Sequence, residues 1–150
     1  MKLSQIVKIA YKEALKAKSN EEVPVGAVIF NNTGIVSKAY NQVIKQGDHL
    51  AHAEILAIKA TRKLKTTSLK DYKIYTTLEP CLLCSYAISK YLISTIYFGA
   101  YDIKNGNIEN GMRIFNKEYK GFRPEIYGGI GMDQSSKLIK NFFSEVRKKS

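Results

Sequence analysis

Residues 74–84 read IYTTLEPCLLC and join two features that decide the fold, a buried strand and a helix that opens with two cysteines. The apolar character of 74–78 predicts the strand. Pro80 suits the first turn of a helix, where its missing N–H group costs nothing, so we predict a helix from about Cys81 to Lys90. The apolar run Ile93 to Phe98 predicts the next strand. This strand–helix–strand order favours a layered α/β domain with parallel strands.

Upstream of this unit, the pattern predicts two helices and a hairpin. Apolar residues recur at helical spacing from Leu3 to Ala17, which indicates a first helix that ends near Ser19-Asn20. The other predicted elements are an antiparallel hairpin of Val25–Phe30 and Ile35–Tyr40, a polar loop over 41–51 and a second helix from His52 into Lys63.

Downstream, the chain is rich in loops until its last helix. The predicted segments are a polar linker over 65–70, a short helix at Met112–Phe115 within the loop 99–121, a short strand at Glu125–Tyr127 and a final helix at Ser135–Lys149. At 150 residues the chain is long enough for one domain with a core of its own, and the hairpin next to a parallel unit predicts a mixed sheet. We therefore expect a single α/β domain over residues 1–150.

The composition indicates a basic protein outside the membrane. Lys and Arg number 24 against 13 Asp and Glu, which gives a net charge of +11. Such an excess suits a polyanionic partner, with nucleic acid as the first candidate, although a solvated lysine surface gives the same count. No apolar run reaches the length of a membrane span, and we expect a cytoplasmic location.

The two cysteines form a Cys-x-x-Cys pair at Cys81 and Cys84, and His52 begins a His-Ala-Glu stretch upstream. Positions i and i+3 share one helix face, so both sulfurs can bind one ion. Two thiolates and an imidazole suit Zn²⁺ and leave a fourth position open for water, whose pKa the ion lowers. A redox pair is the weaker alternative, because a thioredoxin-like unit would carry the pair after its first strand. Glu54 is then placed to move protons beside the ion.

A closed metal site is the alternative with the sharpest consequences. His49 lies three residues before His52 and would give four protein ligands with no open position. The protein would then be a zinc-stabilised RNA-binding module without catalytic activity. In that case Glu54 would have no role.

The His-x-Glu and Pro-Cys-x-x-Cys stretches resemble the signature of the zinc-dependent nucleobase deaminases. The likeness extends over nearly the whole chain in the pattern of the bacterial tRNA-specific adenosine deaminases, through Glu22–Val28, Asn41, Ala51–Glu54, Tyr75–Cys81 and Phe98–Ala100. The resemblance implies a three-layer α/β/α cytidine deaminase-like fold with a central mixed five-stranded sheet, one Zn²⁺ per subunit and a homodimer. It also implies hydrolytic deamination of the wobble adenosine of a tRNA anticodon loop to inosine, in which zinc-bound hydroxide attacks C6 and ammonia is released.

The resemblance assigns roles residue by residue. Metal ligands are His52, Cys81 and Cys84, and Glu54 is the catalytic acid and base. Asn41 and Val23 belong to the base pocket, and the backbone N–H groups of Ala53 and Cys81 bind the developing oxygen.

Other residues are candidates for contacts with the anticodon loop. They are Asp102, Lys104, Arg113, Phe142, Phe143 and the basic tail that begins at Arg147. Adjacent helix residues cannot face one direction, so one phenylalanine of the pair should be buried and the other free to stack on a base.

The sequence leaves three points open. A small-molecule deaminase of guanine, cytosine or a nucleoside has the same zinc motif, and only the basic excess and the C-terminal helix favour tRNA. His49, Leu50 and Tyr101 depart from the family pattern near the expected RNA-facing rim. Glu79, which precedes Pro80, is interpreted as a residue that leads into the zinc helix or caps it.

Overall fold

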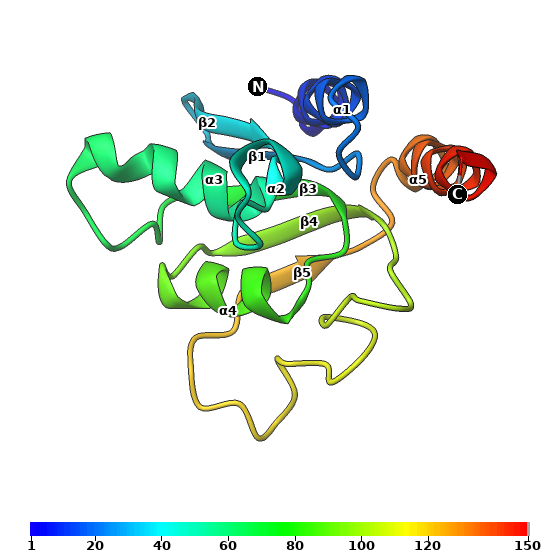
Figure 1. Cartoon of the computed structure of the whole chain (residues 1–150). Helices are drawn as coiled ribbons and strands as arrows, with labels where there is room; N and C mark the ends of the chain where they lie inside the picture. Colours follow the sequence, from blue (N-terminus) through cyan, green and yellow to red (C-terminus); the bar gives the residue numbers. More distant parts are fainter. Residues whose placement is uncertain (150) are drawn as a thin grey trace.

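The computed structural model describes residues 1–149, which contain one mixed five-stranded sheet in the order β2-β1-β3-β4-β5 (Figure 1). The strands are β1 (Gly26–Asn31), β2 (Gly34–Tyr40), β3 (Lys73–Leu78), β4 (Thr95–Ala100) and β5 (Glu125–Tyr127). β1 pairs antiparallel with β2 and β3, whereas β4 lies parallel to both β3 and β5. The predicted mixed sheet is therefore confirmed.

The helices are α1 (Leu3–Ser19), α2 (Val43–Gln46), α3 (Ala53–Ala60), α4 (Leu82–Lys90) and α5 (Met132–Lys149), with a 3₁₀ helix at Thr61–Leu64. None of the helices within residues 1–149 combines the length and apolarity of a membrane span.

The strand residues divide between two cores because successive side chains point to opposite faces of a sheet. On one face, Ile29 and Ile74 pack with Ala57 of α3 and Ile88 of α4. On the other face, Val28, Phe30 and Tyr75 pack with Ile6 and Ala10 of α1.

α5 begins on the α1 face, where the Tyr75 hydroxyl donates a hydrogen bond of 2.6 Å to the carbonyl of Ile130 (Figure 1). The sheet therefore lies between two helical layers, as the family resemblance implies.

α1 approaches the sheet most closely at Gly26. A Cβ atom at this position would overlap the carbonyl oxygen of Ala10 and lie 2.8 Å from the nitrogen of Ala14. Only the absence of a side chain lets the helix backbone rest against β1 here.

Strand register brings four connecting segments to one end of the sheet. Gly26 pairs with Tyr40, so the start of β1 lies beside the end of β2. Thr76 pairs with Ala27 and Leu78 with Ala100, so β3 and β4 also end there. Residues 23–25, 41–42, 79–81 and 101–102 consequently meet at this end, which is where the candidate site forms.

The predicted short helix at Met112–Phe115 is wrong. Gly111 (φ +58°) and Arg113 (φ +47°) have left-handed backbones, which a right-handed helix cannot contain. Asn107 instead holds this segment in turns, because its side-chain oxygen accepts from the Met112 nitrogen at 3.1 Å and its carbonyl accepts from Ile114 at 2.9 Å.

Other boundaries moved by a few residues. α2 interrupts the predicted loop 41–51, and α5 begins at Met132 rather than Ser135. The predicted polar linker 65–70 contains Leu69, which is fully buried against the core.

Candidate active site

The proposed metal ligands begin two helices. His52 is the N-cap of α3 and Cys81 the N-cap of α4, both with extended backbones. N-cap side chains usually bond to the first turn of their helix. Neither side chain does so here, and both turn towards each other instead. Cys84 lies in the first turn of α4, is buried and completes the group.

The three donor atoms have the spacing of a tetrahedral zinc site. The Nδ1 atom of His52 lies 3.3 Å from the sulfur of Cys84 and 3.5 Å from that of Cys81, and all three donor atoms lie within 4.8 Å of one another. Zn–N and Zn–S bonds of about 2.05 and 2.3 Å at the tetrahedral angle give an N···S edge of about 3.6 Å. The group therefore fits one Zn²⁺ with three protein ligands and a fourth, open position.

His49 does not take part in this group. Its side chain is exposed, and the cluster that the structure brings together within residues 1–149 contains His52, Cys81 and Cys84 without it. The closed site with four protein ligands therefore lacks its fourth ligand.

The electrostatics of the metal-free group favour one thiolate. A hydrogen bond from Cys84 lowers the pKa of Cys81 to about 4, with His52 adding to the effect and burial opposing it. The same shared hydrogen bond, together with burial, raises the pKa of Cys84. The pKa of His52 is raised by its hydrogen bond with Cys81, against the effect of burial. A cation is thus the natural partner of the Cys81 sulfur.

Glu54 follows His52 by two residues and is only 5% exposed. Burial raises the pKa of its carboxyl group to about 7, and the charge of Cys81 adds to this effect. A group with a pKa near neutrality both takes and returns a proton readily. Such a carboxyl next to a metal group is typical of an acid–base catalyst.

Asn41 and Val23 meet beside the start of α3. The Asn41 side-chain nitrogen donates to the Val23 carbonyl at 3.3 Å, and its backbone nitrogen donates to Val25 at 3.1 Å. The next residue, Gln42, donates to the carbonyl of Ala51 at 2.9 Å, which ties this corner to the His52 segment. The structure therefore brings the predicted pocket residues together with Ala53, the first residue of α3.

Two buried glutamates near the site hold neighbouring segments in place, a role that the sequence did not predict. Glu22 accepts hydrogen bonds from the backbone nitrogens of Ile44 (3.0 Å) and Lys45 (2.8 Å), which fixes the start of α2. Glu79 does not cap α4, contrary to one interpretation of the sequence. Its carboxylate accepts five hydrogen bonds from segment 102–110, including one from the nitrogen of Asp102 at 3.0 Å. A carboxylate at the end of an apolar strand was the only sequence signal of this role.

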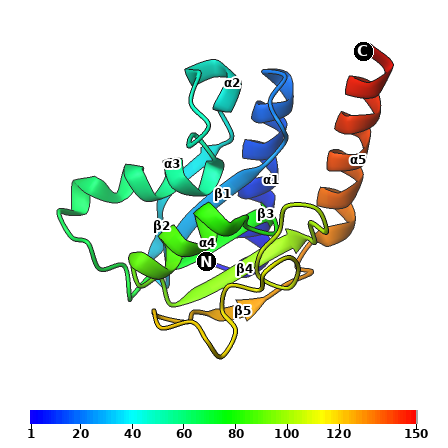
Figure 2. The same cartoon turned by 60° about the horizontal axis from the view of Figure 1, so that its bottom comes forward.

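The candidate RNA-binding residues of the last helix lie on a different part of the surface. Phe142 is 9% exposed and Phe143 41%, so one ring is buried and the other exposed, as predicted. The two rings contact each other edge to face at 5.3 Å. The end of α5, which carries Arg147, lies beside the end of α1, where Lys18 and Glu145 approach to 3.9 Å (Figure 2).

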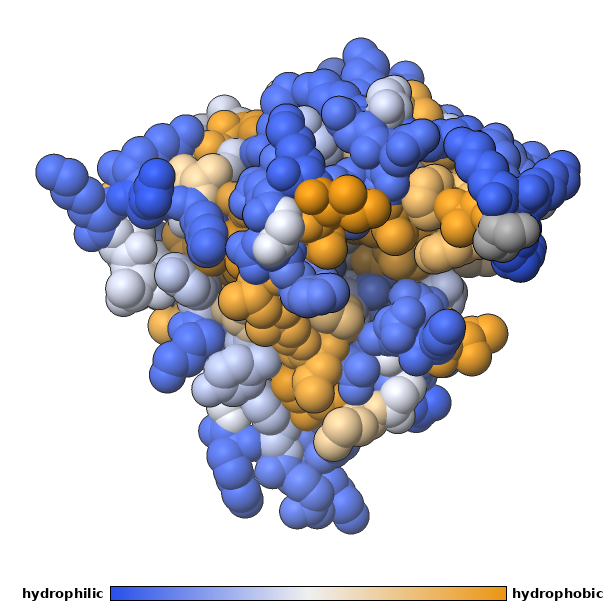
Figure 3. Space-filling view, in the orientation of Figure 1, coloured by the Kyte–Doolittle hydropathy of each residue, from blue (hydrophilic) through white to orange (hydrophobic). Residues whose placement is uncertain are grey.

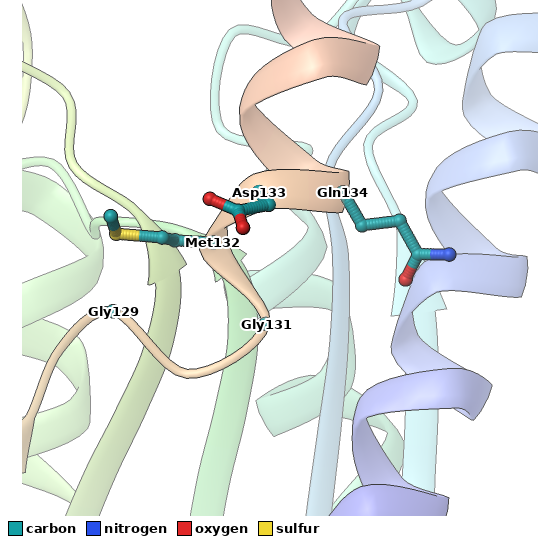
Figure 4. Close-up of a pocket in the computed structure, with 5 residues that line it drawn as sticks. All are labelled: Gly129, Gly131, Met132, Asp133 and Gln134. Atoms are coloured by element: carbon teal, nitrogen blue, oxygen red, sulfur yellow. The ribbon is translucent and has the colours of Figure 1, made fainter.

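A surface hollow of about 400 Å³ lies at the start of α5 (Figure 4). Its lining residues are Gly129, Gly131, Met132, Asp133 and Gln134. The side chains of Asp133 and Gln134 point to different sides of the helix start (Figure 4). Neither the three proposed metal ligands nor the base-pocket residues Val23 and Asn41 line this hollow. The hollow is therefore separate from the candidate active site.

Comparison with known proteins agrees with this geometry. A family model described as the cytidine and deoxycytidylate deaminase zinc-binding region matches residues 1–100. A tRNA-specific adenosine deaminase of Rickettsia bellii (strain RML369-C) is 45% identical over 141 residues, which are 92% of this chain and 97% of the relative.

Solved structures show the same likeness. A structure from biochemical and structural studies of A-to-I editing by tRNA:A34 deaminases is 33% identical, with a TM-score of 0.87 over 90% of this chain and 99% of that chain. The guanine deaminase from Bacillus subtilis is 31% identical with a TM-score of 0.64, over 67% of this chain and 66% of that one. The chain therefore belongs to the zinc-binding cytidine and deoxycytidylate deaminase family and, within it, to the tRNA-specific adenosine deaminases.

Proposed function

We propose that this protein deaminates the wobble adenosine of a tRNA anticodon loop to inosine, with water as co-substrate and ammonia as the second product. The observation that carries the proposal is the buried Glu54 carboxyl group beside a three-ligand metal site with an open fourth position. A tRNA-specific adenosine deaminase of Rickettsia bellii is 45% identical over 92% of this chain, whereas guanine deaminases are 31% identical over 67% of it (Bacillus subtilis) and 18% identical over 94% (Nitrosomonas europaea). The higher identity over nearly the full length supports tRNA over free guanine.

The proposed chemistry divides between the ion and the chain. When bound, zinc supplies a Lewis acid that activates water for attack near neutral pH. Glu54 accepts one proton from that water and delivers it to N1 of the purine, and then carries the second proton of the added oxygen to the departing amine as the C6–N bond breaks. The backbone N–H groups of Ala53 and Cys81 hold the oxygen that develops at C6, since they lie at the first turns of α3 and α4.

The base itself is held by the corner of Asn41 and Val23. The Asn41 amide is buried and fixed through its nitrogen to Val23, so its position is set before the substrate arrives. The wobble adenosine is unpaired in an anticodon loop, so its extrusion costs little. Phe143, which is exposed on α5, and Arg147 are proposed contacts to the flanking nucleotides.

Incubation with an anticodon stem-loop tests this function directly. The zinc-loaded protein should convert wobble adenosine to inosine, measured by nucleoside chromatography, and should leave free guanine unchanged. Guanine turnover with an inert stem-loop would replace the proposal by a small-molecule deaminase. Binding of the stem-loop without turnover would indicate a non-catalytic module.

We also propose a homodimer in the cytoplasm. Leu82, Leu83 and Tyr86 are exposed on α4. Apolar side chains gather over this helix in Figure 3. Burial of such a patch against a second copy would remove it from water. Light scattering should give twice the chain mass, and Tyr86→Lys should shift the protein to the monomer. A monomeric parent protein would contradict the dimer.

Cell fractionation tests the proposed cytoplasmic location.

A further inference from the structure

Glu79 occupies a position that none of the proposed catalytic steps uses. It directly follows β3, precedes Pro80 and is two residues from the metal ligand Cys81. Its side chain is nearly fully buried. A buried carboxylate is unfavourable unless hydrogen bonds replace its hydration. The bonds that Glu79 makes therefore indicate why this residue is present.

Both carboxylate oxygens of Glu79 accept hydrogen bonds from one segment of the chain, residues 102–110. Oε1 accepts from the nitrogen of Asp102 at 3.0 Å and from the side-chain nitrogen of Asn110 at 2.6 Å. Oε2 accepts from the backbone nitrogens of Ile108 (3.1 Å), Glu109 (2.8 Å) and Asn110 (3.1 Å). Five donors that converge on one carboxylate form a clamp around which segment 102–110 folds.

One further contact joins this segment to the metal-bearing turn, and a second joins the turn to the end of β4. The nitrogen of Asn107 donates to the carbonyl of Pro80 at 3.0 Å, and the nitrogen of Glu79 donates to Ala100 at 2.8 Å. A Cβ atom at Gly106 would lie 2.5 Å from the Glu79 carboxyl carbon and 2.5 Å from the carbonyl of Asp102. The segment thus rests directly on Glu79, with no room for a side chain.

We infer that Glu79 is a positioning residue that fastens segment 102–110 to the turn carrying Cys81. Because one carboxylate holds both parts, the loop that ends β4 and the metal ligand move as one unit. Glu79 acts through the loop and the turn, because both of its carboxylate oxygens are directed at segment 102–110. The part of this inference that concerns the RNA substrate rests on the proposed function.

Glu79→Gln tests the clamp with little change of shape. An amide group in place of either oxygen loses at least two of the five hydrogen bonds and directs its own hydrogens at N–H donors. The loss of two bonds to a charged acceptor should increase local opening about 100-fold. Hydrogen exchange at the amides of Ile108, Glu109 and Asn110 should accelerate by this factor while the rest of the sheet stays protected.

Zinc and substrate give the positioning readouts. Zinc should still bind at one ion per chain, but its release to a chelator should accelerate about 10-fold, as expected when a support of a metal ligand is lost. The KM for the stem-loop should rise about 10-fold with kcat nearly unchanged, because only the ordered fraction of the loop binds. A merely structural role would lower the melting temperature and leave zinc release and KM at 25 °C unchanged.

Two variants control the experiment. Glu109→Gln makes the same chemical change at an exposed carboxylate and should alter nothing. Asn110→Ala removes the side-chain donor alone and should give a smaller acceleration of exchange, which also covers the case that Glu79→Gln fails to fold.

Unchanged exchange in Glu79→Gln would overturn the clamp. Faster exchange with unchanged zinc release and KM would overturn its positioning role. If the parent protein forms no inosine, the proposed function fails, and exchange and zinc release still decide this inference.

Discussion

Replacement of Glu54 by glutamine should abolish turnover and, at the same time, stabilise the metal-free fold. Burial, with a contribution from the charge of Cys81, raises the pKa of Glu54 from 4.5 to about 7 in the folded, metal-free protein. Each pKa unit corresponds to about 1.36 kcal/mol, so ionisation of Glu54 costs the folded state about 3 kcal/mol relative to the unfolded chain. Glutamine has no charge to bury and avoids this cost.

The sign of the pH dependence follows from the direction of this change. Between pH 4.5 and about 7 the folded state holds the Glu54 proton more tightly than the unfolded chain does. The free energy of unfolding therefore falls as the pH rises through this window, and the full penalty is present above it. Glu54→Gln should be more stable than the parent by about 1 to 3 kcal/mol at pH 8, since desolvation of the amide offsets part of the gain. The difference should vanish near pH 4.5.

Urea denaturation in the presence of a chelator measures this difference at pH 8 and at pH 5. The inosine assay on the zinc-loaded variant measures the loss of turnover. Glu118→Gln, at an exposed carboxylate, is the matched control and should change neither quantity. Equal stability of variant and parent at pH 8 would refute the energetic argument, and retained turnover would refute the role of Glu54 as proton carrier.

Three further predictions concern the metal, the last helix and the packing of α1. His49→Ala should retain one zinc per chain and the activity, because this side chain is exposed; loss of the metal, measured by atomic absorption, would restore the closed site. Phe142→Ala should lower the free energy of unfolding by about 3 kcal/mol, whereas Phe143→Ala should leave it nearly unchanged and raise the KM for the stem-loop. The opposite pattern in urea titrations and kinetics would contradict this assignment. Gly26→Ala should destabilise the fold by about 1 to 3 kcal/mol, because its methyl group would overlap the Ala10 carbonyl, and an unchanged melting temperature would show that α1 can move away.

The sheet and the metal group could be predicted because their signals are local. The apolar strand 74–78, Pro80 and the Cys-x-x-Cys pair lie within eleven consecutive residues, and together they fix a strand, a helix start and two ligands. His52 was placed with them by the chemistry of zinc rather than by any contact visible in the sequence. One hairpin and one strand–helix–strand unit also indicated a mixed sheet, but the strand order β2-β1-β3-β4-β5 is known only from the structure.

The loops could not be predicted because their partners are distant. The donors that surround Glu79 come 23 to 31 residues later in the chain, and nothing in either stretch identifies the other. The wrong helix at Met112–Phe115 has a different cause, because its partner Asn107 is only five to seven residues away. Local apolar residues favoured a helix, but the side chain and carbonyl of Asn107 hold the backbone in turns instead.

Three buried glutamates surround the site, and the groups around their oxygens separate their roles. Glu22 and Glu79 direct both oxygens at backbone N–H groups, so their lone pairs are occupied and they fix loops. Glu54 lies beside the thiol groups of Cys81 and Cys84 instead, and burial raises its pKa towards neutrality. A carboxylate whose oxygens already accept hydrogen bonds from a loop is committed to holding that loop. Of the three, only Glu54 is therefore suited to carry a proton between water and a base, although burial alone would not distinguish it from the other two.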